Sequence, residues 1–389
     1  MSLNACILIH YHELSLKGDN RSWFEKIFKR NVRKHIKPLP FTNIETKAAR
    51  VFIFGVDAEQ WNEYAIELKK VMGLINAHLM HGVEADMEAM KATAAELISH
   101  KKFETFRVST KRQYKNFPFT SQDVNKEIGA YLQPICNKPV KLKGADLNVI
   151  IELVNGKAYI GVDKIQGYGG LPVGTGENAI SLISSGIDSP VSSFEMIKRG
   201  VSLSYVHFHS APATSRQSIK NVQKLLKVIA GYQIKCMLYN IPLLAIQEKI
   251  METAPSKFWV ILFRRAMLRI SEQIAEQIGA VALITGENVG QVASQTLSNM
   301  RATADAVDRP ILRPLAGMNK EDIINRAREI GTYEISIEPY EDCCSFFVPI
   351  HPETRANLDE VRAIEESIDM SGLYETAIEN LEKIIIEGK

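Results

Sequence analysis

The segment from Ala179 to Pro190 brings together residue types that bind phosphate. An apolar strand leads into a loop, residues 184–189, with the sequence Ser-Ser-Gly-Ile-Asp-Ser, and a helix follows at once. Backbone N–H groups at a helix N-terminus lack partners inside the helix, and the helix dipole favours negative charge there. A phosphate or pyrophosphate group is therefore expected at this turn. The loop is not a Walker loop, because no Gly-Lys-Ser/Thr follows its glycine.

The loop resembles the Ser-Gly-Gly-X-Asp-Ser pyrophosphate loop of the N-type ATP pyrophosphatases, which cleave ATP to AMP and pyrophosphate while adenylating a substrate. Ser184, Gly186, Asp188 and Ser189 fall in register with that motif, whereas Ser185 replaces its first glycine. Serine suits that position only if the backbone angles accept a residue with a Cβ atom. Asp188 is expected to hold Mg²⁺, which bridges phosphate oxygens and offsets their charge. The alternative is a generic strand-to-helix turn.

Strands and helices alternate from residue 178 onward. Strands are expected at 179–184, 203–207, 234–239, 281–285 and 311–314, and helices at 190–199, 218–229, 257–278 and 320–330. This alternation predicts an α/β domain with a doubly wound parallel sheet covered on both faces. Ligands bind such sheets at the carboxyl ends of the strands, which is where the loop lies.

Two smaller modules are expected before this domain. Residues 1–57 hold a strand at 4–10, a basic helix at 20–37 and a strand at 50–54; residues 58–165 alternate helices at 59–71, 87–100 and 121–132 with short strands. A glycine-rich linker at 166–177 then precedes the domain at 178–389. The linker is not a Rossmann loop, because such a loop follows a strand and opens a helix.

Bulk properties agree with several domains and a cytoplasmic protein. The 389 residues exceed one ordinary core. We expect no membrane span and no signal peptide, and the five cysteines lack framework spacing. Residues 1–50 carry ten Lys/Arg against four Asp/Glu, and residues 321–389 carry six against seventeen. The basic front indicates contact with a polyanion, and solvated helix faces are the equal alternative.

The full chain resembles the tRNA 4-thiouridine synthetases, in the form without a rhodanese domain. The resemblance is carried by residues 11–21, 107–121 and 167–176, by the 184–189 loop, and by Glu-Asp-Cys-Cys at 341–344 followed by Val-Pro. It implies an N-terminal ferredoxin-like domain, a THUMP RNA-binding domain and a C-terminal PP-loop ATP pyrophosphatase domain. Unlike archaeal-type relatives, the chain has no Cys-X-X-Cys pair.

The resemblance also implies a reaction and partners. ATP, with Mg²⁺, adenylates O4 of a tRNA uridine, and a cysteine persulfide then delivers sulfur to C4. A cysteine desulfurase supplies the persulfide; some relatives pass sulfur to a ThiS-like carrier for the thiamine thiazole, and a homodimer is expected. Two alternatives stay open: an amidotransferase-like PP-loop enzyme, or a tRNA-binding protein with a degenerate ATP site.

By the same resemblance, further residues contact the nucleotide. Besides the loop they are Leu182, Ile183, His207, Phe208, Arg264, Gly286 and Gln295. From the residues alone, His207 and His209 could be ordinary satisfied histidines, Arg264 or Arg265 could sit in an internal salt bridge, and Gly286 could mark a plain turn.

Cys343 and Cys344 are the implied catalytic thiols. Both follow acidic residues, which do not lower a thiol pKa. By resemblance Cys343 carries the sulfur, and Cys344 is a bystander or disulfide partner. Adjacent cysteines chelate one metal awkwardly, so no zinc site is expected. Cys6, Cys136 and Cys236 are expected to pack in cores.

Basic residues interleaved with aromatics are expected to bind tRNA phosphates and bases. The candidates are Lys17, Arg21, Lys29, Arg33, Arg107, Lys111, Arg112, Lys115 and Phe117. The aromatic rings could equally belong to the module core, and this alternative is expected for Phe119.

Overall fold

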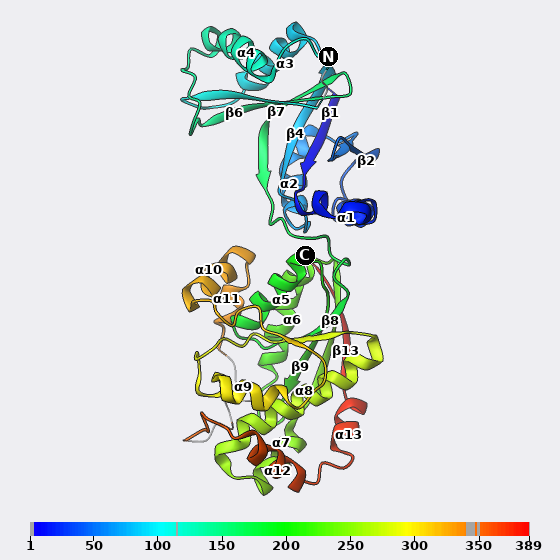
Figure 1. The fold of residues 1–389 in the computed structure, drawn as a ribbon, viewed down its shortest axis with the longest axis vertical. Coiled ribbons are helices and arrows are strands. Elements are labelled where there is room, and N and C mark those ends of the chain that lie inside the picture. Colours follow the sequence, from blue (N-terminus) through cyan, green and yellow to red (C-terminus); the bar gives the residue numbers. More distant parts are fainter. Residues whose placement is uncertain (1–3, 114–115, 340–346, 348–350, 389) are drawn as a thin grey trace. The chain divides into compact units, whose positions relative to one another are not determined.

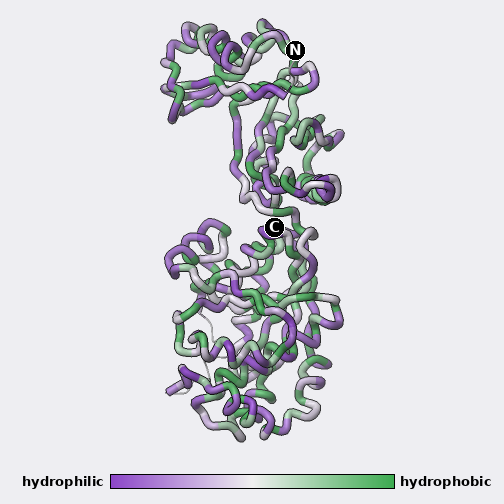
Figure 2. Tube along the Cα trace, viewed as in Figure 1, coloured by the Kyte–Doolittle hydropathy of each residue, from purple (hydrophilic) through white to green (hydrophobic). Residues whose placement is uncertain are grey.

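The computed structural model describes residues 4–113, 116–339, 347 and 351–388. It divides into two compact units, Met1–Pro172 and Val173–Lys389 (Figure 1). Polar and apolar residues are interspersed along the helices of both units (Figure 2). No helix in the described ranges is long and apolar enough to cross a bilayer.

The first unit is built on one seven-stranded sheet of order β2-β3-β1-β4-β7-β6-β5. Its pairs are antiparallel except for β5 with β6. The strands are β1 (Asn4–His10), β2 (Asn43–Lys47), β3 (Arg50–Phe54), β4 (Asn76–Glu84), β5 (Phe106–Arg112), β6 (Leu147–Val154) and β7 (Lys157–Gln166). The helices are α1 (Arg21–His35), α2 (Trp61–Lys69), α3 (Met87–Ser99) and α4 (Ser121–Cys136).

Several buried clusters pack against this sheet. One packs α1 and α2 against β1 and β3, and another packs α3 and α4 against β5 and β6. The long strands β4 and β7 contribute side chains to both of these clusters. A further cluster holds side chains of the strands themselves, among them Cys6, Phe52, Met80 and Tyr159. A single sheet thus connects the two modules expected from the sequence; the boundary at residue 57 stays a prediction.

The second unit contains a six-stranded sheet of order β12-β11-β8-β9-β10-β13. The strands are β8 (Asn178–Leu182), β9 (Ser202–His209), β10 (Lys235–Pro242), β11 (Ala282–Ile284), β12 (Ile311–Leu312) and β13 (Glu382–Glu387). The first five in this order run parallel, which confirms the predicted doubly wound sheet. Chain order reverses beside β8, so the switch point lies where β8 ends.

Helices cover both faces of this sheet. On one face lie α5 (Asp188–Lys198), α6 (Gln217–Ala230), α10 (Lys320–Ile330) and α11 (Tyr333–Ser336). On the other lie α7 (Leu244–Thr253), α8 (Trp259–Ile278), α9 (Leu297–Ala304), α12 (Leu358–Ser367) and α13 (Leu373–Glu379). The strands between them are buried from both sides, as parallel strands require.

The acidic C-terminal segment ends in a strand. After α12 and α13 the chain forms β13, which pairs antiparallel with β10. Three consecutive isoleucines, Ile384 to Ile386, favour the extended backbone. β13 is thus the edge strand of the sheet, next to β10.

Candidate active site

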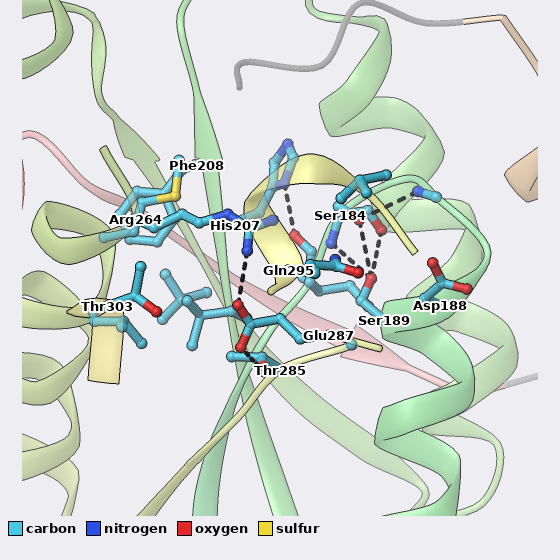
Figure 3. Close-up of a pocket in the computed structure, with 18 residues that line it drawn as sticks. Ser184, Asp188, Ser189, His207, Phe208, Arg264, Thr285, Glu287, Gln295 and Thr303 are labelled. Carbon is cyan, nitrogen blue, oxygen red and sulfur yellow. Dashed lines mark hydrogen bonds and ion pairs between the residues drawn. The ribbon is translucent and has the colours of Figure 1, made fainter. Parts of the chain in front are cut away.

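A cavity of about 410 Å³ opens at the carboxyl ends of β8, β9 and β11 (Figure 3). All the predicted nucleotide-contacting residues except Ser185 line it: Leu182, Ile183, Ser184, Gly186, Asp188, Ser189, His207, Phe208, Arg264, Gly286 and Gln295. Sequence reasoning missed the remaining lining residues Val206, Met267, Leu268, Thr285, Glu287, Val292 and Thr303. The cavity lies at the switch point, where the topology rule places a ligand.

Hydrogen bonds within the 184–189 loop fix its shape. The Ser184 N–H donates to Ser189 Oγ at 2.9 Å, and the Gly186 N–H lies 3.4 Å from Ser184 Oγ. The Ser189 hydroxyl in turn lies 3.2 Å from the Ser184 carbonyl oxygen. The residue before α5, Ile187, offers no side-chain cap. The first N–H groups of α5 are therefore left for an anion.

Ser185 fits its position without backbone strain. Its φ lies outside the left-handed region that favours glycine. The side chain is 1% exposed and does not line the cavity. The serine that replaces the family's first glycine therefore neither strains the loop backbone nor lines the cavity.

Gly286 follows β11 and passes directly over the start of α5. A Cβ atom added to it would lie 2.8 Å from the backbone nitrogen of Ser189 and 3.0 Å from the carbonyl carbon of Asp188. Real Cβ atoms do not approach backbone this closely, so glycine is required here rather than merely tolerated in a turn.

We therefore expect Gly286→Ala to displace the loop. Overpacking of this kind costs about 1–3 kcal/mol of unfolding free energy, and ATP binding should weaken because the loop N–H groups move. Chemical denaturation and equilibrium ATP binding measure the two effects. Gly317→Ala is the matched control, since nothing lies within 4 Å of its added Cβ and its φ is not positive. Equal ATP affinity in both variants would contradict the role of Gly286.

The Asp188 carboxylate is held by two side chains from distant parts of the chain. Lys320 Nζ lies 2.6 Å from its Oδ1, and Gln291 Nε2 donates to its Oδ2 at 2.8 Å. Lys320 is the first residue of α10. The sequence pattern predicted this helix but not a role for Lys320 at the site. The pair places one carboxylate and one ammonium at the edge of the phosphate-sized space.

Glu287 is a buried carboxylate on the cavity wall. Arg264 Nη1 lies 2.7 Å from its Oε1, and Arg313 Nε lies 2.7 Å from its Oε2. Burial alone would raise the pKa of Glu287, but the two guanidinium groups outweigh it and lower that pKa. Arg264 therefore lies at the cavity (Figure 3), and the Glu287 carboxylate offsets its charge.

The neighbouring Arg265 points away from the cavity. It is 1% exposed and forms ion pairs with Glu365 at 2.6 Å and Asp305 at 3.2 Å. Arg269 also pairs with Glu365 at 2.8 Å. Of the two adjacent arginines, Arg265 thus takes the internal salt bridge, which ties α8 to α9 and α12.

Removing Glu365 should destabilise the second unit. Glu365→Ala leaves the buried Arg265 guanidinium short of a partner, which costs about 3–5 kcal/mol of unfolding free energy. Denaturant titration of the full chain measures it. The control Glu366→Ala deletes an exposed carboxylate one residue further along α12. Equal stability of the two variants would show that the network contributes nothing.

The wall of the cavity formed by β9 and α8 is apolar. Phe208, Val206 and Met267 lie together there, and Phe208 and Met267 belong to the core that α8 packs onto the sheet. His207 is buried; its Nδ1 lies 3.0 Å from the Ile183 carbonyl oxygen. An apolar wall beside a phosphate-binding loop suits a flat purine with an attached phosphate chain.

The candidate tRNA-binding residues at the front of the chain lie on and before α1. Lys17 precedes the helix, and Arg21, Lys29 and Arg33 lie on it, all at least partly exposed. Arg21 Nε lies 2.7 Å from Glu25 Oε1 within the helix. Three of the four cations thus have no ion pair in the described part of the chain.

A second basic group lies on β5 and corrects an expectation. Arg107, Lys111 and Arg112 come from this strand, and Arg112 donates to the carbonyls of Phe117 and Phe119 at 3.1 and 2.9 Å. Phe117 is 6% exposed and lies in the core, whereas Phe119 is 40% exposed. The prediction that Phe117 meets tRNA and Phe119 fills the core is therefore wrong for both rings.

The implied sulfur-transfer residues Cys343 and Cys344, and the tRNA candidate Lys115, lie outside the described residues. The core-packing expectation is confirmed for Cys6 and Cys236, and burial raises the pKa of each thiol to about 12. Cys136 is half-buried at the end of α4. Neither buried thiol is a nucleophile at neutral pH.

Comparison with known proteins agrees with this geometry. Three family descriptions match: the ThiI ferredoxin-like domain at residues 6–77, the THUMP domain at 84–163, and thiamine biosynthesis protein (ThiI) at 174–370. These matches confirm the three domain types expected from the sequence.

Similar proteins extend over the whole chain. Probable tRNA sulfurtransferases from Caldanaerobacter subterraneus and Clostridium kluyveri are 41% and 42% identical, covering 98% and 97% of this chain and 99% and 98% of their own. A crystal structure of a 4-thiouridine synthetase–RNA complex with bound ATP superposes with a TM-score of 0.89 at 35% identity, over 99% of this chain and 100% of that one. The chain therefore belongs to the ThiI family.

Proposed function

We propose that this chain is an ATP-dependent tRNA sulfurtransferase that converts a tRNA uridine to 4-thiouridine. The observation that carries the proposal is the convergence of the predicted nucleotide-contacting residues on one cavity at the switch point of the sheet. The 4-thiouridine synthetase of the same fold was crystallised with ATP and RNA, which agrees with both substrates.

In the proposed reaction the 184–189 loop holds the phosphates of ATP. Its N–H groups and the hydroxyls of Ser184 and Ser189 donate to phosphate oxygens, and the apolar wall at Phe208 contacts the adenine. Uridine O4 attacks the α-phosphorus, the bond to the β-phosphate breaks, and pyrophosphate leaves with its charge offset by Lys320. Fixed donors of this kind stabilise the developing charge without reorganisation.

Asp188 fits a Mg²⁺ ion that arrives with ATP. Mg²⁺ binds through one or two carboxylates plus substrate phosphates, and Asp188 presents one carboxylate at the first turn of α5. Bound there, the ion would offset the negative charge of the phosphates. The carboxylate now paired with Lys320 and Gln291 would exchange those partners for the ion.

Sulfur transfer is assigned to Cys343. A persulfide on this cysteine, loaded by a cysteine desulfurase, attacks C4 and expels AMP. A second thiol then attacks the Cys343 sulfur, forms a disulfide with it and leaves the outer sulfur on C4. Delivery of sulfur to a ThiS-like carrier for thiamine, and a homodimeric assembly, complete the proposal. The tRNA would contact the cations on α1 and β5 of the first unit.

One assay tests the proposal. The full chain is incubated with ATP, Mg²⁺ and an unmodified tRNA transcript, and AMP and pyrophosphate are quantified with and without tRNA. Equimolar release of both, dependent on tRNA, is expected. Release of ADP and inorganic phosphate, or AMP formation that ignores tRNA, would contradict it. The amidotransferase-like alternative predicts AMP formation with ammonia in place of tRNA.

A further inference from the structure

Val292 marks the mouth of the nucleotide cavity. Among the described residues that line the cavity, Val292 alone is exposed, at 48%. The apolar wall at Phe208 and Met267 is by contrast buried, with exposures of 6% and 7%. A side chain that both lines a cavity and reaches solvent lies where the cavity opens. A second substrate that joins a bound nucleotide therefore arrives beside Val292.

This mouth lies at the end of the cavity where the phosphates are proposed to bind. Val292 follows Gln291, whose Nε2 donates to Asp188 Oδ2 at 2.8 Å at the start of α5. Backbone hydrogen bonds hold the segment in place. The Gln295 N–H donates to the Val292 carbonyl oxygen, and the Gly290 N–H donates to the Gln295 carbonyl oxygen, both at 2.9 Å. Val292 is thus fixed near the phosphate-binding turn, at the opposite end from the adenine wall.

The segment around the mouth suits an uncharged ligand rather than another phosphate. Residues 289–297 include no charged side chain, and Val289 and Leu297 are 43% and 70% exposed. A phosphate needs cations or free N–H groups, and the 184–189 loop already offers N–H groups to the phosphates of ATP. The adenine already has its own apolar wall at Phe208. Exposed apolar side chains at the mouth therefore indicate a second ligand with an apolar face.

We propose that Val292 packs against the uracil ring of the target uridine while O4 attacks the α-phosphorus. The inference rests on the proposed function, because that reaction brings an uncharged base to the phosphate end of a bound ATP. Enzymes that act on a base take it out of its stack and hold its faces against aromatic or apolar side chains. Val292 combines the apolar surface, the exposure and the position that such a contact requires.

The test compares Val292→Ala with wild type in the full chain, at saturating ATP and tRNA. The variant loses apolar contact with the base, so tRNA-dependent AMP formation should fall about 10-fold. The tRNA dissociation constant should stay within about 3-fold, because phosphate contacts dominate affinity. The ATP dissociation constant should not change. Val292→Ile keeps the apolar surface and should retain the wild-type rate.

Val281→Ala is the matched control. Val281 is also 48% exposed, but it precedes β11, at the end of that strand away from the cavity, and does not line it. Its variant should form AMP at the wild-type rate. AMP formation by Val292→Ala at the wild-type rate would overturn this inference while leaving the proposed function intact. Weaker ATP binding by Val292→Ala would also overturn it, because Val292 would then contact the nucleotide.

Photocrosslinking tests the contact without a variant. A tRNA that carries 4-thiouridine at the modified position is irradiated in complex with the wild-type protein, and the attached residue is mapped by mass spectrometry. Attachment within residues 289–297 is expected, and attachment confined to other residues would overturn the inference. Wild-type protein that forms no AMP with unmodified tRNA would contradict the proposed function itself.

Discussion

Asp188→Ala is expected to lower tRNA-dependent AMP formation by about 1,000-fold, in the range seen when a fixed charge-stabilising group is removed. The carboxylate lies at the start of α5, where the phosphates and their Mg²⁺ are proposed to bind, and it is held by Lys320 and Gln291. Without it, the ion would lose the carboxylate proposed to hold it. Affinity for tRNA should not change, because the tRNA candidates lie on α1 and β5.

Glu321→Ala controls for the loss of an acidic side chain near this site. Glu321 is exposed and adjacent to Lys320 in the chain, but it does not line the cavity. Its variant should form AMP at the wild-type rate. Full AMP production by Asp188→Ala would refute the assignment of Asp188, and a parallel loss of tRNA binding would indicate that the variant is misfolded.

Cys343→Ser is expected to abolish 4-thiouridine formation, by about 1,000-fold or more, as for a nucleophile whose function no neighbour replaces. A hydroxyl cannot carry a persulfide, so no sulfur reaches C4. Pyrophosphate release in the first turnover should persist, because adenylation of O4 precedes sulfur transfer. The two readouts separate the two halves of the reaction.

Cys344→Ser is the matched control, since it makes the same change one residue away. Its 4-thiouridine formation should continue. Equal activity of the two single variants would overturn the assignment of sulfur transfer to Cys343. Loss of pyrophosphate release in Cys343→Ser would indicate that the cysteine acts before adenylation.

The local parts of the site could be predicted from the sequence. The 184–189 loop is contiguous, and its small residues, its aspartate and the following helix each indicate phosphate binding on their own. The parallel sheet was predictable because strands and helices alternate along the chain from residue 178 onward. The side chains that contact the loop could not be predicted, since Lys320 reaches Asp188 across 132 positions of chain. Resemblance located Arg264, but only the fold pairs it with Glu287.

Two further differences have physical causes. Strand β4 was missed because residues 77–81 are buried on both faces, so the alternation typical of a half-exposed strand is absent. Its two histidines, His78 and His81, further weaken the apolar pattern from which a buried strand is predicted. The roles of Phe117 and Phe119 were reversed because both lie in the irregular loop between β5 and α4, where a side chain's direction depends on tertiary packing rather than on periodicity.

The central claim is that uridine O4 is joined to the α-phosphate of ATP in the cavity above β8. The most direct test uses tRNA labelled with oxygen-18 at uridine O4, with unlabelled ATP and a sulfur donor, and mass analysis of the released AMP. The account predicts one labelled oxygen in the phosphate of each AMP that accompanies a 4-thiouridine. Unlabelled AMP alongside 4-thiouridine would contradict it.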